Sequence, residues 1–403
     1  MHRVRVDEWS SALEESTLCQ LRLNSPATGR WFPALRVLSW WITEDNPTYA
    51  DLFLSPHLEK VSISVSWTWS DSEVPRDILL AIASTIAALP ASSLQHVFIG
   101  VDHYGMPWEY FKEALSSVIL RCGPSLTEFA SPIPLSDAAV NHLLHLPHLR
   151  IWHVEGPPPN YSASSSPLVF PPLTEFTLGE GAGHGWLSLI GRLEGRASAT
   201  RQGVTPLSRM KGSLNSLDVQ SLSGPMTDSS FASSVQMFRN LAYLNVADYC
   251  HDRDGEGQCT FKLNNDNVTK LAVSLPRLES LQLGHPCSEN TCSTTVVCLL
   301  PISVYCVKLQ SLEIHFNTTN IVDDLKNISE DPRLQEWRSL PRCPLSCLDV
   351  YLMPLALDET GFKTVAEGMI DIFPSLGHCE GLTDVWDEVS ETLRYVNTPA
   401  RRQ

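Results

Sequence analysis

The sequence predicts an α/β fold: a leucine-rich-repeat solenoid of horseshoe shape, with a parallel concave sheet and convex helices. Three observations indicate this class. A motif of the form Leu-x-x-apolar-x-apolar recurs along the chain. The last residues of each copy alternate between apolar and polar, as in a strand with one buried face. Helical periodicity fills the segments between the copies.

The motif copies run through most of the chain at irregular spacing. Successive copies begin at Leu35, Leu58, Leu94, Leu126, Leu149, Leu173, Leu214, Leu241, Leu278, Leu309 and Leu345, and a degenerate copy begins at Leu376. From Leu35 to Leu345 is 310 residues in ten steps, a mean period of 31. Proline precedes several copies, as Pro147 precedes Leu149, and it ends the helix before it and favours an extended segment.

Between the strands, apolar residues spaced three and four apart predict helices at 76–89, 108–121, 137–145, 266–275 and 360–372. Candidate helix caps are Ser136 or Asp137, Asn265 or Asp266, and Gly123. One strand–helix repeat cannot bury both of its faces, so stability is expected from the stacking of neighbouring repeats.

The predicted organisation has five segments. These are an N-terminal cap at 1–31, repeats at 32–155, a Pro/Ser-rich loop at 156–169, further repeats at 170–380, and a C-terminal helix and tail at 381–403. The stretch from Arg192 to Lys211 holds five basic residues and one acidic residue, a local net charge of +4. It is interpreted either as a contact or regulatory loop around Ser198, or as a solvated insertion.

Charge and hydropathy exclude some classes of partner. Lys and Arg number 29 against 45 Asp and Glu, a formal net charge of −16, which argues against sequence-independent nucleic-acid binding and against docking on an anionic membrane. No apolar run reaches the ~20 residues of a membrane span, and the start has no apolar signal-peptide core. The eleven cysteines are therefore expected to be reduced thiols of a cytoplasmic or nuclear protein.

No motif of catalysis or cofactor binding is complete. The glycine-rich run from Gly179 to Gly185 lacks the spacing of a dinucleotide loop and is interpreted as a strand-to-helix turn that needs positive φ. The cysteines from Cys287 to Cys306 lack the short paired spacing of zinc ligands and are expected to be buried structural thiols. We therefore expect no catalytic residue, metal or cofactor.

The residues between and beside the apolar strand positions are expected to point out of the concave face. They include His315, exposed aromatic residues and six carboxylates against one lysine. Aromatic anchors in a polar surround are typical of a protein-binding face, and an acidic face favours a partner with basic character. We predict partner contacts at Trp41, Phe98, His153, Glu155, Glu175, Asp218, Tyr243, Glu313, Asp349 and Tyr351.

Several phrases carry a family resemblance. Two helix–strand segments, one with Leu135-Ser136-Asp137 and Leu146-Pro147-His148-Leu149, the other with Leu271-Ala272 and Leu275-Pro276-Arg277-Leu278, look like the leucine-rich repeats of F-box proteins. The phrases Leu52-Phe53-Leu54-Ser55-Pro56-His57-Leu58, Pro206-Leu207-Ser208-Arg209 and Trp386-Asp387-Glu388-Val389 resemble the fungal families of F-box-like leucine-rich-repeat proteins.

The resemblance implies a non-enzymatic substrate-recognition component of a cullin-type ubiquitin ligase, or a truncated relative of one. In that family an F-box binds a Skp1-like adaptor and the repeats select the substrate. Here the first motif strand begins at Leu35 and leaves no room for an F-box before it, so residues 1–31 are expected to be a cap or a remnant. Adaptor binding is expected only if an F-box lies upstream.

Two other functions stay open at this stage. A leucine-rich-repeat scaffold or GTPase regulator unrelated to ubiquitin rests on the analogy of fold alone. A metal-dependent hydrolase would need the Cys287–Cys306 stretch to bind a metal ion.

Overall fold

A computed structural model describes much of the chain, and it divides the chain into two compact units. They are Met1–Gly179, the N-terminal unit, and Glu180–Gln403, the C-terminal unit. The described residues are 3–5, 15–24, 31–42, 49–65, 76–101, 109–156, 158, 170–179, 182–183, 185–190, 208–220, 228–247, 263–284, 293–330, 332, 337, 339–350, 357, 359–381 and 384–396. Most of the Pro/Ser-rich stretch and of the basic stretch before Ser208 lies outside them.

The N-terminal unit is built on a parallel sheet whose strands follow chain order. They are β1 (Arg3–Arg5), β2 (Val37–Ile42), β3 (Lys60–Val65), β4 (His96–Val101), β5 (Glu128–Ala130), β6 (Ile151–Val154) and β7 (Glu175–Leu178). Each pairs in parallel with the next. Strand β1, which the motif search did not predict, pairs with β2.

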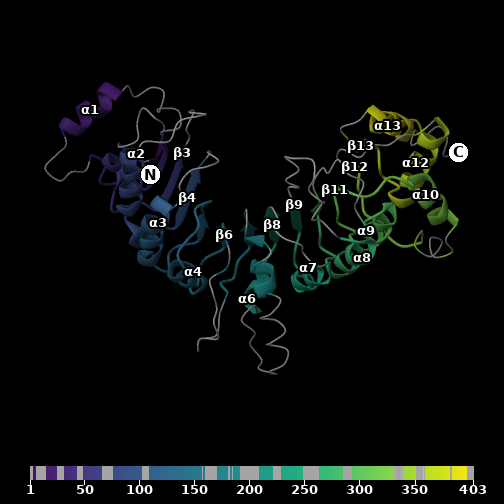
Figure 1. Ribbon diagram of the computed structural model, residues 1–403, viewed down its shortest axis with the longest axis horizontal. Helices are drawn as coiled ribbons and strands as arrows, with labels where there is room; N and C mark the ends of the chain where they lie inside the picture. The colour runs from purple at the N-terminus through teal and green to yellow at the C-terminus, as the bar shows by residue number, and fades with distance from the viewer. Residues whose placement is uncertain are drawn as a thin grey trace. The chain divides into compact units, whose positions relative to one another are not determined.

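Helices of the N-terminal unit connect these strands. They are α1 (Glu15–Leu23), η1 (Ala50–Phe53), α2 (Arg76–Ala87), η2 (Ala91–Ser93), α3 (Glu109–Arg121) and α4 (Asp137–Leu144). Helix α3 packs against both α2 and α4, and the three lie on one side of the strands (Figure 1). The other side of the sheet is here called the open face of the N-terminal unit.

The C-terminal unit repeats this plan. Its strands are β8 (Ser216–Gln220), β9 (Tyr243–Ala247), β10 (Ser280–Leu283), β11 (Ser311–Ile314), β12 (Cys347–Asp349) and β13 (His378–Glu380), parallel and in chain order. Its helices are α6 (Ser208–Ser213), α7 (Asp228–Val235), α8 (Asn265–Ser274), η3 (Val296–Cys298), α9 (Leu299–Tyr305), α10 (Ile321–Glu330), α12 (Glu359–Ile372) and α13 (Asp384–Val396). Helices α7, α8 and α9 lie on one side of its strands (Figure 1), and the other side is its open face.

The buried leucines explain why the strands form where they do. Every motif copy from Leu35 to Leu376 is followed by a strand that begins two residues after its first leucine. Each of these first leucines is at most 2% exposed. The α/β class and the parallel sheet predicted from the sequence are thus confirmed, and Leu244 and Leu281 of successive copies are partners in register.

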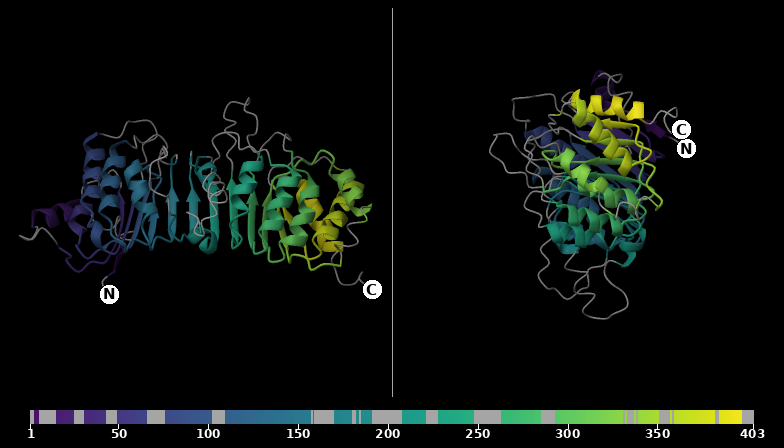
Figure 2. Two further views of the ribbon diagram at one scale, coloured as in Figure 1. Left: turned by 90° about the horizontal axis from the view of Figure 1, so that it is seen from below. Right: turned by 90° about the vertical axis from the view of Figure 1, so that its right-hand side faces the viewer.

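The strands of each unit lie side by side (Figure 2), and a shared carbonyl aligns most of them with the next strand. The carbonyl oxygen of Arg36 accepts hydrogen bonds from the N–H groups of both Glu59 and Lys60, and the carbonyl of Glu59 does the same for Gln95 and His96. The pattern recurs at later strands of both units. Because two consecutive donors meet one acceptor, the register is set just before each strand begins.

Helix α13 covers the last strand of the C-terminal unit. The hydroxyl of Ser390 accepts a hydrogen bond from the N–H of Cys379 (2.9 Å) and donates one to its carbonyl (2.6 Å). These are backbone groups that an edge strand would otherwise leave unpaired. Nearby, Arg342 donates to the carbonyls of Asp371 and Ile372, which ties the approach to β12 to the end of α12.

Two of the expected helix caps need correction. Ser136 caps α4 as predicted, since its hydroxyl accepts from the N–H of Ala139 at 3.3 Å. The cap of α8, however, is Asn264, one residue before the predicted pair, because its side chain accepts from the N–H of Asn267 at 2.9 Å. Gly123 follows α3 without the left-handed backbone of a glycine cap; Gly156 and Gly284 are the positive-φ glycines among the described residues.

In the parts of the chain that the structure describes, no helix combines the length and the apolar character needed to cross a membrane.

Candidate functional site

Alternate strand positions form the open faces, as predicted from strand periodicity. On β2, β3 and β4 the residues Leu38, Val61 and Val97 are buried, while their neighbours in sequence are not. The outward residues of the N-terminal unit form rows across the strands, because in-register residues of parallel neighbours lie side by side. One such row is Ser39, Ser62, Phe98, Ala130, His153 and Thr177.

Two exposed aromatic residues lie on the open face of the N-terminal unit, on strands β2 and β4, which β3 separates. Trp41 is 42% exposed and Phe98 46% exposed. Trp41 is in register with Ser64 and, one strand further, with Gly100. A Cβ atom on Gly100 would come within 3.0 Å of the Phe98 ring, so the ring lies against this glycine. Each of the two exposed aromatic side chains thus lies beside a small residue and is a candidate anchor for a partner.

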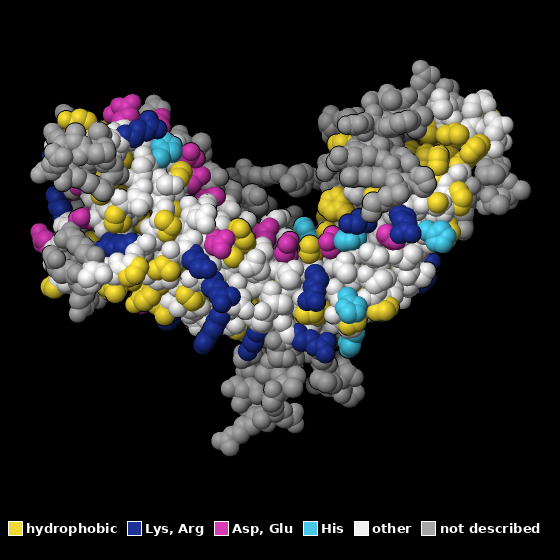
Figure 3. All heavy atoms as spheres, turned by 180° about the vertical axis from the view of Figure 1, so that it is seen from behind, with side chains coloured by type: hydrophobic (Ala, Val, Ile, Leu, Met, Phe, Trp, Pro, Cys, Tyr) yellow, Lys and Arg dark blue, Asp and Glu magenta, His cyan; other side chains and the backbone are white. Residues whose placement is uncertain are grey.

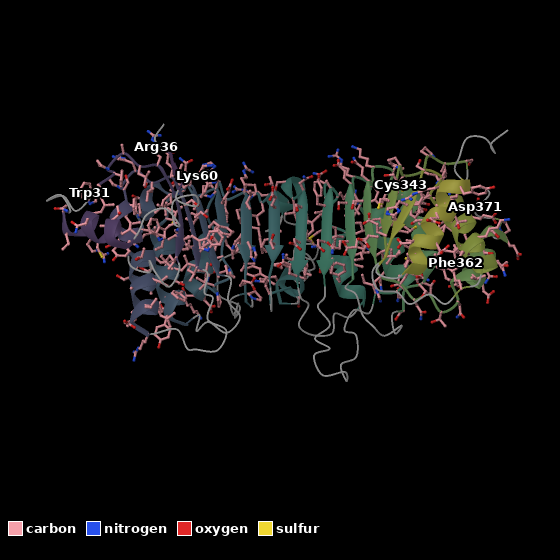
Figure 4. All side chains as sticks on the ribbon, turned by 90° about the horizontal axis from the view of Figure 1, so that it is seen from above. Trp31, Arg36, Lys60, Cys343, Phe362 and Asp371 are labelled. Atoms are coloured by element: carbon pink, nitrogen blue, oxygen red, sulfur yellow. The ribbon has the colours of Figure 1, made fainter. Side chains whose placement is uncertain are left out.

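Acidic and basic groups occur together on this face. His96 and Glu128, which are in register on β4 and β5, place Nδ1 and Oε2 2.6 Å apart. The predicted residue Glu175 begins β7 and is exposed, one row from Thr177. Lys60, the lysine of the predicted face, lies at the start of β3 (Figure 4). The N-terminal unit therefore carries acidic and basic groups together.

The predicted residues His153 and Glu155 come together, and they explain Gly179. His153 Nε2 lies 3.1 Å from Oε1 of Glu155, whose side chain is only 14% exposed. A Cβ atom on Gly179 would overlap the Glu155 carboxylate. The positive φ expected for the glycine run that begins here is wrong at Gly179, which instead leaves room for a carboxylate at the end of β7.

The open face of the C-terminal unit has a different character. Its middle outward positions are in register on all of its strands and form the central row: Asp218, Asn245, Gln282, Glu313, Asp349 and Glu380. Strands β8 to β13 contain no lysine or arginine. Lysine and arginine occur elsewhere on the surface (dark blue in Figure 3). Their absence from these strands is therefore a local property of the face and does not reflect a lack of basic residues in the protein. Four of the six side chains are carboxylates.

Amide side chains hold two of these carboxylates. Nε2 of Gln220 donates to Oδ2 of Asp218 at 2.8 Å. Nε2 of Gln282 donates to Oε1 of Glu313 across β10 and β11. Oδ1 of Asn245, by contrast, is buried from water and accepts no hydrogen bond. The central row therefore presents more acceptors than the described residues provide donors.

Burial and like charges raise two pKa values in the central row. Burial raises the pKa of Glu313 to about 7; the hydrogen bond from Gln282 opposes this shift, and the charge of Asp349 adds to it. The pKa of Asp349 is raised by burial and then by the charge of Glu380. Carboxylates side by side on neighbouring strands resist ionising together, so part of this row holds a proton near neutral pH.

The first outward position of each strand flanks this row. The predicted residue Tyr243 is 47% exposed and lies next to Asn245 on β9. His378, at the same position on β13, places Nε2 3.3 Å from Oε1 of Glu380. The sequence analysis missed His378 and Glu380 as site residues. Their signal was Leu376-x-x-Cys379, a motif copy in which cysteine replaces the second apolar residue.

Two outward positions expected from the sequence do not belong to the described face. His315 was expected to point outward, but it follows β11 and is buried, with 5% exposure. Tyr351 lies outside the described residues. Of the predicted contacts, Glu313 and Asp349 are in-register neighbours, His153 and Glu155 are paired, and Trp41 and Phe98 are separated by β3.

The cysteines behave as core residues where the structure describes them. Cys298, Cys306 and Cys343 are buried, as expected for structural thiols, whereas Cys287 and Cys292 lie outside the described residues. Burial raises the pKa of the Cys306 thiol to about 12 and of the Cys343 thiol to about 11. Within the described ranges, no three histidine, cysteine or acidic side chains are grouped so that they could hold a metal ion.

Comparison with known proteins does not identify a family: no protein-family model and no curated protein matches this chain.

Proposed function

We propose that this chain is a leucine-rich-repeat solenoid of the horseshoe type, which binds another protein through its open sheet faces and catalyses no reaction. Support for the repeat comes from the buried leucine two residues before every strand from β2 to β13. Repeats of this kind contact only their neighbours and offer extended surfaces for recognition.

The observation that carries the binding function is the set of outward side chains on the strands. Trp41, Phe98 and Tyr243 are large side chains that stay between 42% and 47% exposed on sheet faces whose other outward residues are mostly small or polar. Exposed aromatic anchors with a polar surround carry most of the binding energy at protein interfaces. The carboxylates of the C-terminal unit favour a partner with basic character.

The proposed context is substrate recognition for a cullin-type ubiquitin ligase, or descent from such a receptor, in the cytoplasm or nucleus. The repeat phrases that resemble F-box-like leucine-rich-repeat proteins support it, for example Leu275-Pro276-Arg277-Leu278. A Skp1-like adaptor would bind only through an F-box upstream. The open faces would then select the protein to be modified.

The binding function is tested by affinity purification and mass spectrometry with variants of the two sides of each unit. The face variant combines Trp41→Ala, Phe98→Ala and Tyr243→Ala. The control variant combines Leu80→Ala and Val273→Ala, which remove side chains of equal exposure (50% and 51%) from α2 and α8. The proposal expects the face variant to lose the captured partner and the control to keep it. Loss in the control alone would place binding on the helices.

The ubiquitin context has its own test. Purified protein is mixed with a Skp1-like adaptor bound to a cullin, and binding is measured by size-exclusion chromatography. The same measurement is made with any longer form of the chain that the gene encodes. Absence of binding by every form would leave a protein-binding module without a link to the ligase.

A further inference from the structure

We propose that the central row of the C-terminal unit docks an extended, lysine- or arginine-rich segment of the partner protein, with basic side chains against Glu313, Asp349 and Glu380. This inference rests on the proposed function, since it names the partner chemistry of one open face. It goes beyond that function in assigning the basic segment to one row of one unit.

The first argument is charge complementarity on a sheet face that presents an exposed aromatic residue. Glu313, Asp349 and Glu380 occupy the same register on three adjacent strands, about 4.8 Å apart. His378, at 3.3 Å from Glu380, is the one basic group at ion-pair distance from these three among the described residues. Like charges in direct cross-strand contact are destabilising, so a cationic ligand would relieve a repulsion that the fold itself leaves in place.

The central row also contains a buried hydrogen-bond acceptor that lacks a donor. Oδ1 of Asn245 is buried from water without a hydrogen bond, and it lies in the same row between Asp218 and Gln282. A buried oxygen without a donor costs free energy, and native structures rarely retain one without reason. An N–H or ammonium group of a bound segment would satisfy it.

The geometry favours a chain of cations over a single ion. The carboxylates follow one another along the row, and nowhere in the described residues do three possible ligands gather about one point. Five strand spacings from β8 to β13 span about 24 Å, which an extended segment rising about 3.3 Å per residue covers in seven or eight residues. Tyr243, 47% exposed beside the row, offers a ring face to which basic side chains also bind.

Binding should be linked to protons. The groups facing Glu313 are Gln282 on β10, Asp349 and Cys347 on β12, and beyond them Glu380 and His378 on β13. Burial and Asp349 raise the pKa of Glu313 to about 7. An incoming ammonium group favours the ionised carboxylate, so affinity should rise as the pH increases through this value.

The probe is fluorescein-labelled decalysine, long enough to cover the row, with binding measured by fluorescence anisotropy at low salt. The first variant is the double substitution Glu313→Gln and Asp349→Asn. Its matched control is Asp77→Asn with Glu113→Gln, which removes two exposed carboxylates from helices α2 and α3 of the N-terminal unit and changes the net charge equally. We expect about tenfold weaker binding for the first variant and less than about twofold for the control. Equal losses would mean that decalysine follows net charge only, and would overturn the assignment.

The second measurement is the pH dependence of the same binding between pH 5.5 and 8. Wild-type affinity should increase over this range, and the single variant Glu313→Gln should lose most of that increase; a variant as steep as the wild type would contradict the assignment. Failure of this docking proposal can be distinguished from failure of the proposed binding function. If partner capture depends on the open faces but decalysine ignores Glu313 and Asp349, the binding function stands and the docking of a basic segment falls.

Discussion

Gln282 and Glu313 are hydrogen-bonded side chains on adjacent strands, and from Glu313 onward every residue of the central row is a carboxylate. The amide donates to the ionised carboxylate and so opposes the rise in the pKa of Glu313 that burial produces. The charge of Asp349, on the neighbouring strand at the other side, raises the pKa of Glu313 further. The protonation of Glu313 therefore depends on its neighbours on both sides of the row.

The first prediction concerns the pH dependence of stability. The folded state raises the pKa of Glu313 from 4.5 to about 7, so it holds the proton more tightly than the unfolded chain. The stability gained from this is present below pH 4.5 and is lost as the pH rises to 7. Glu313→Gln should therefore raise stability relative to the wild type at pH 8 more than at pH 4.5, as measured by urea unfolding of both proteins.

Gln282→Ala is the matched variant for this experiment. It removes the donor and keeps the carboxylate, so the loss of stability between pH 4.5 and 8 should become steeper than in the wild type. If each variant changes the free energy of unfolding by the same amount at pH 4.5 as at pH 8, Glu313 does not titrate as described.

The second prediction tests the alternation of buried and outward residues on β10. Leu281 is 3% exposed and Ser280, its neighbour, is on the open face. Leu281→Ala should cost about 2–5 kcal/mol because it leaves a cavity between sheet and helices. Ser280→Ala should change stability by less than about 0.5 kcal/mol. Urea unfolding measures both, and similar losses would show that β10 is turned the other way.

The sequence was sufficient to predict the strands because each one depends on local pattern. A leucine such as Leu149, followed by alternating residues, has one low-energy arrangement, with its apolar side chains toward the helices. The outward residues then follow by alternation, which is how Trp41, Tyr243 and Glu313 were identified. Strand β1 was not predicted because Arg3–Arg5 lacks the motif, and its strand conformation depends on pairing with β2.

Properties that depend on residues distant in sequence could not be predicted. The raised pKa of Glu313 requires Asp349, which lies on a separate strand and faces Glu313 only through the register of β11 and β12. The role of Gly179 requires the carboxylate of Glu155. His315 continues the alternation in sequence but is buried after β11 ends. The alternation of apolar and polar residues describes a single strand, and it carries no information about side chains that the fold brings in from other strands.

The third prediction concerns thiol chemistry. Cys122, Cys306 and Cys343 are at most 3% exposed, and burial raises the pKa of the first two to about 12 and of Cys343 to about 11. The thiolate is the reactive species, so these residues should resist iodoacetamide in native protein at pH 8 and react fully in guanidinium chloride. Peptide mass spectrometry after timed labelling measures this. Rapid native labelling of Cys306 would contradict the burial of α9 and its neighbours.

The last prediction compares two glycines beside β13. A Cβ atom on Gly381 would lie 2.7 Å from Cγ of Trp386, a residue of α13 whose side chain is completely buried. A Cβ atom on Gly377 would meet only the carbonyl oxygen of Ser346, at 4.0 Å. Neither glycine has positive φ, so the two substitutions differ in packing and not in backbone strain.

Gly381→Ala should therefore destabilise the C-terminal unit by about 1–3 kcal/mol, because a buried indole cannot move aside without displacing its own neighbours. Gly377→Ala should be close to neutral, within about 0.5 kcal/mol. Thermal unfolding of both variants, together with the native fluorescence of the tryptophans, measures the difference. If Gly381→Ala is as stable as Gly377→Ala, Trp386 does not hold α13 against β13, and the edge of the sheet is less protected than the hydrogen bonds of Ser390 indicate.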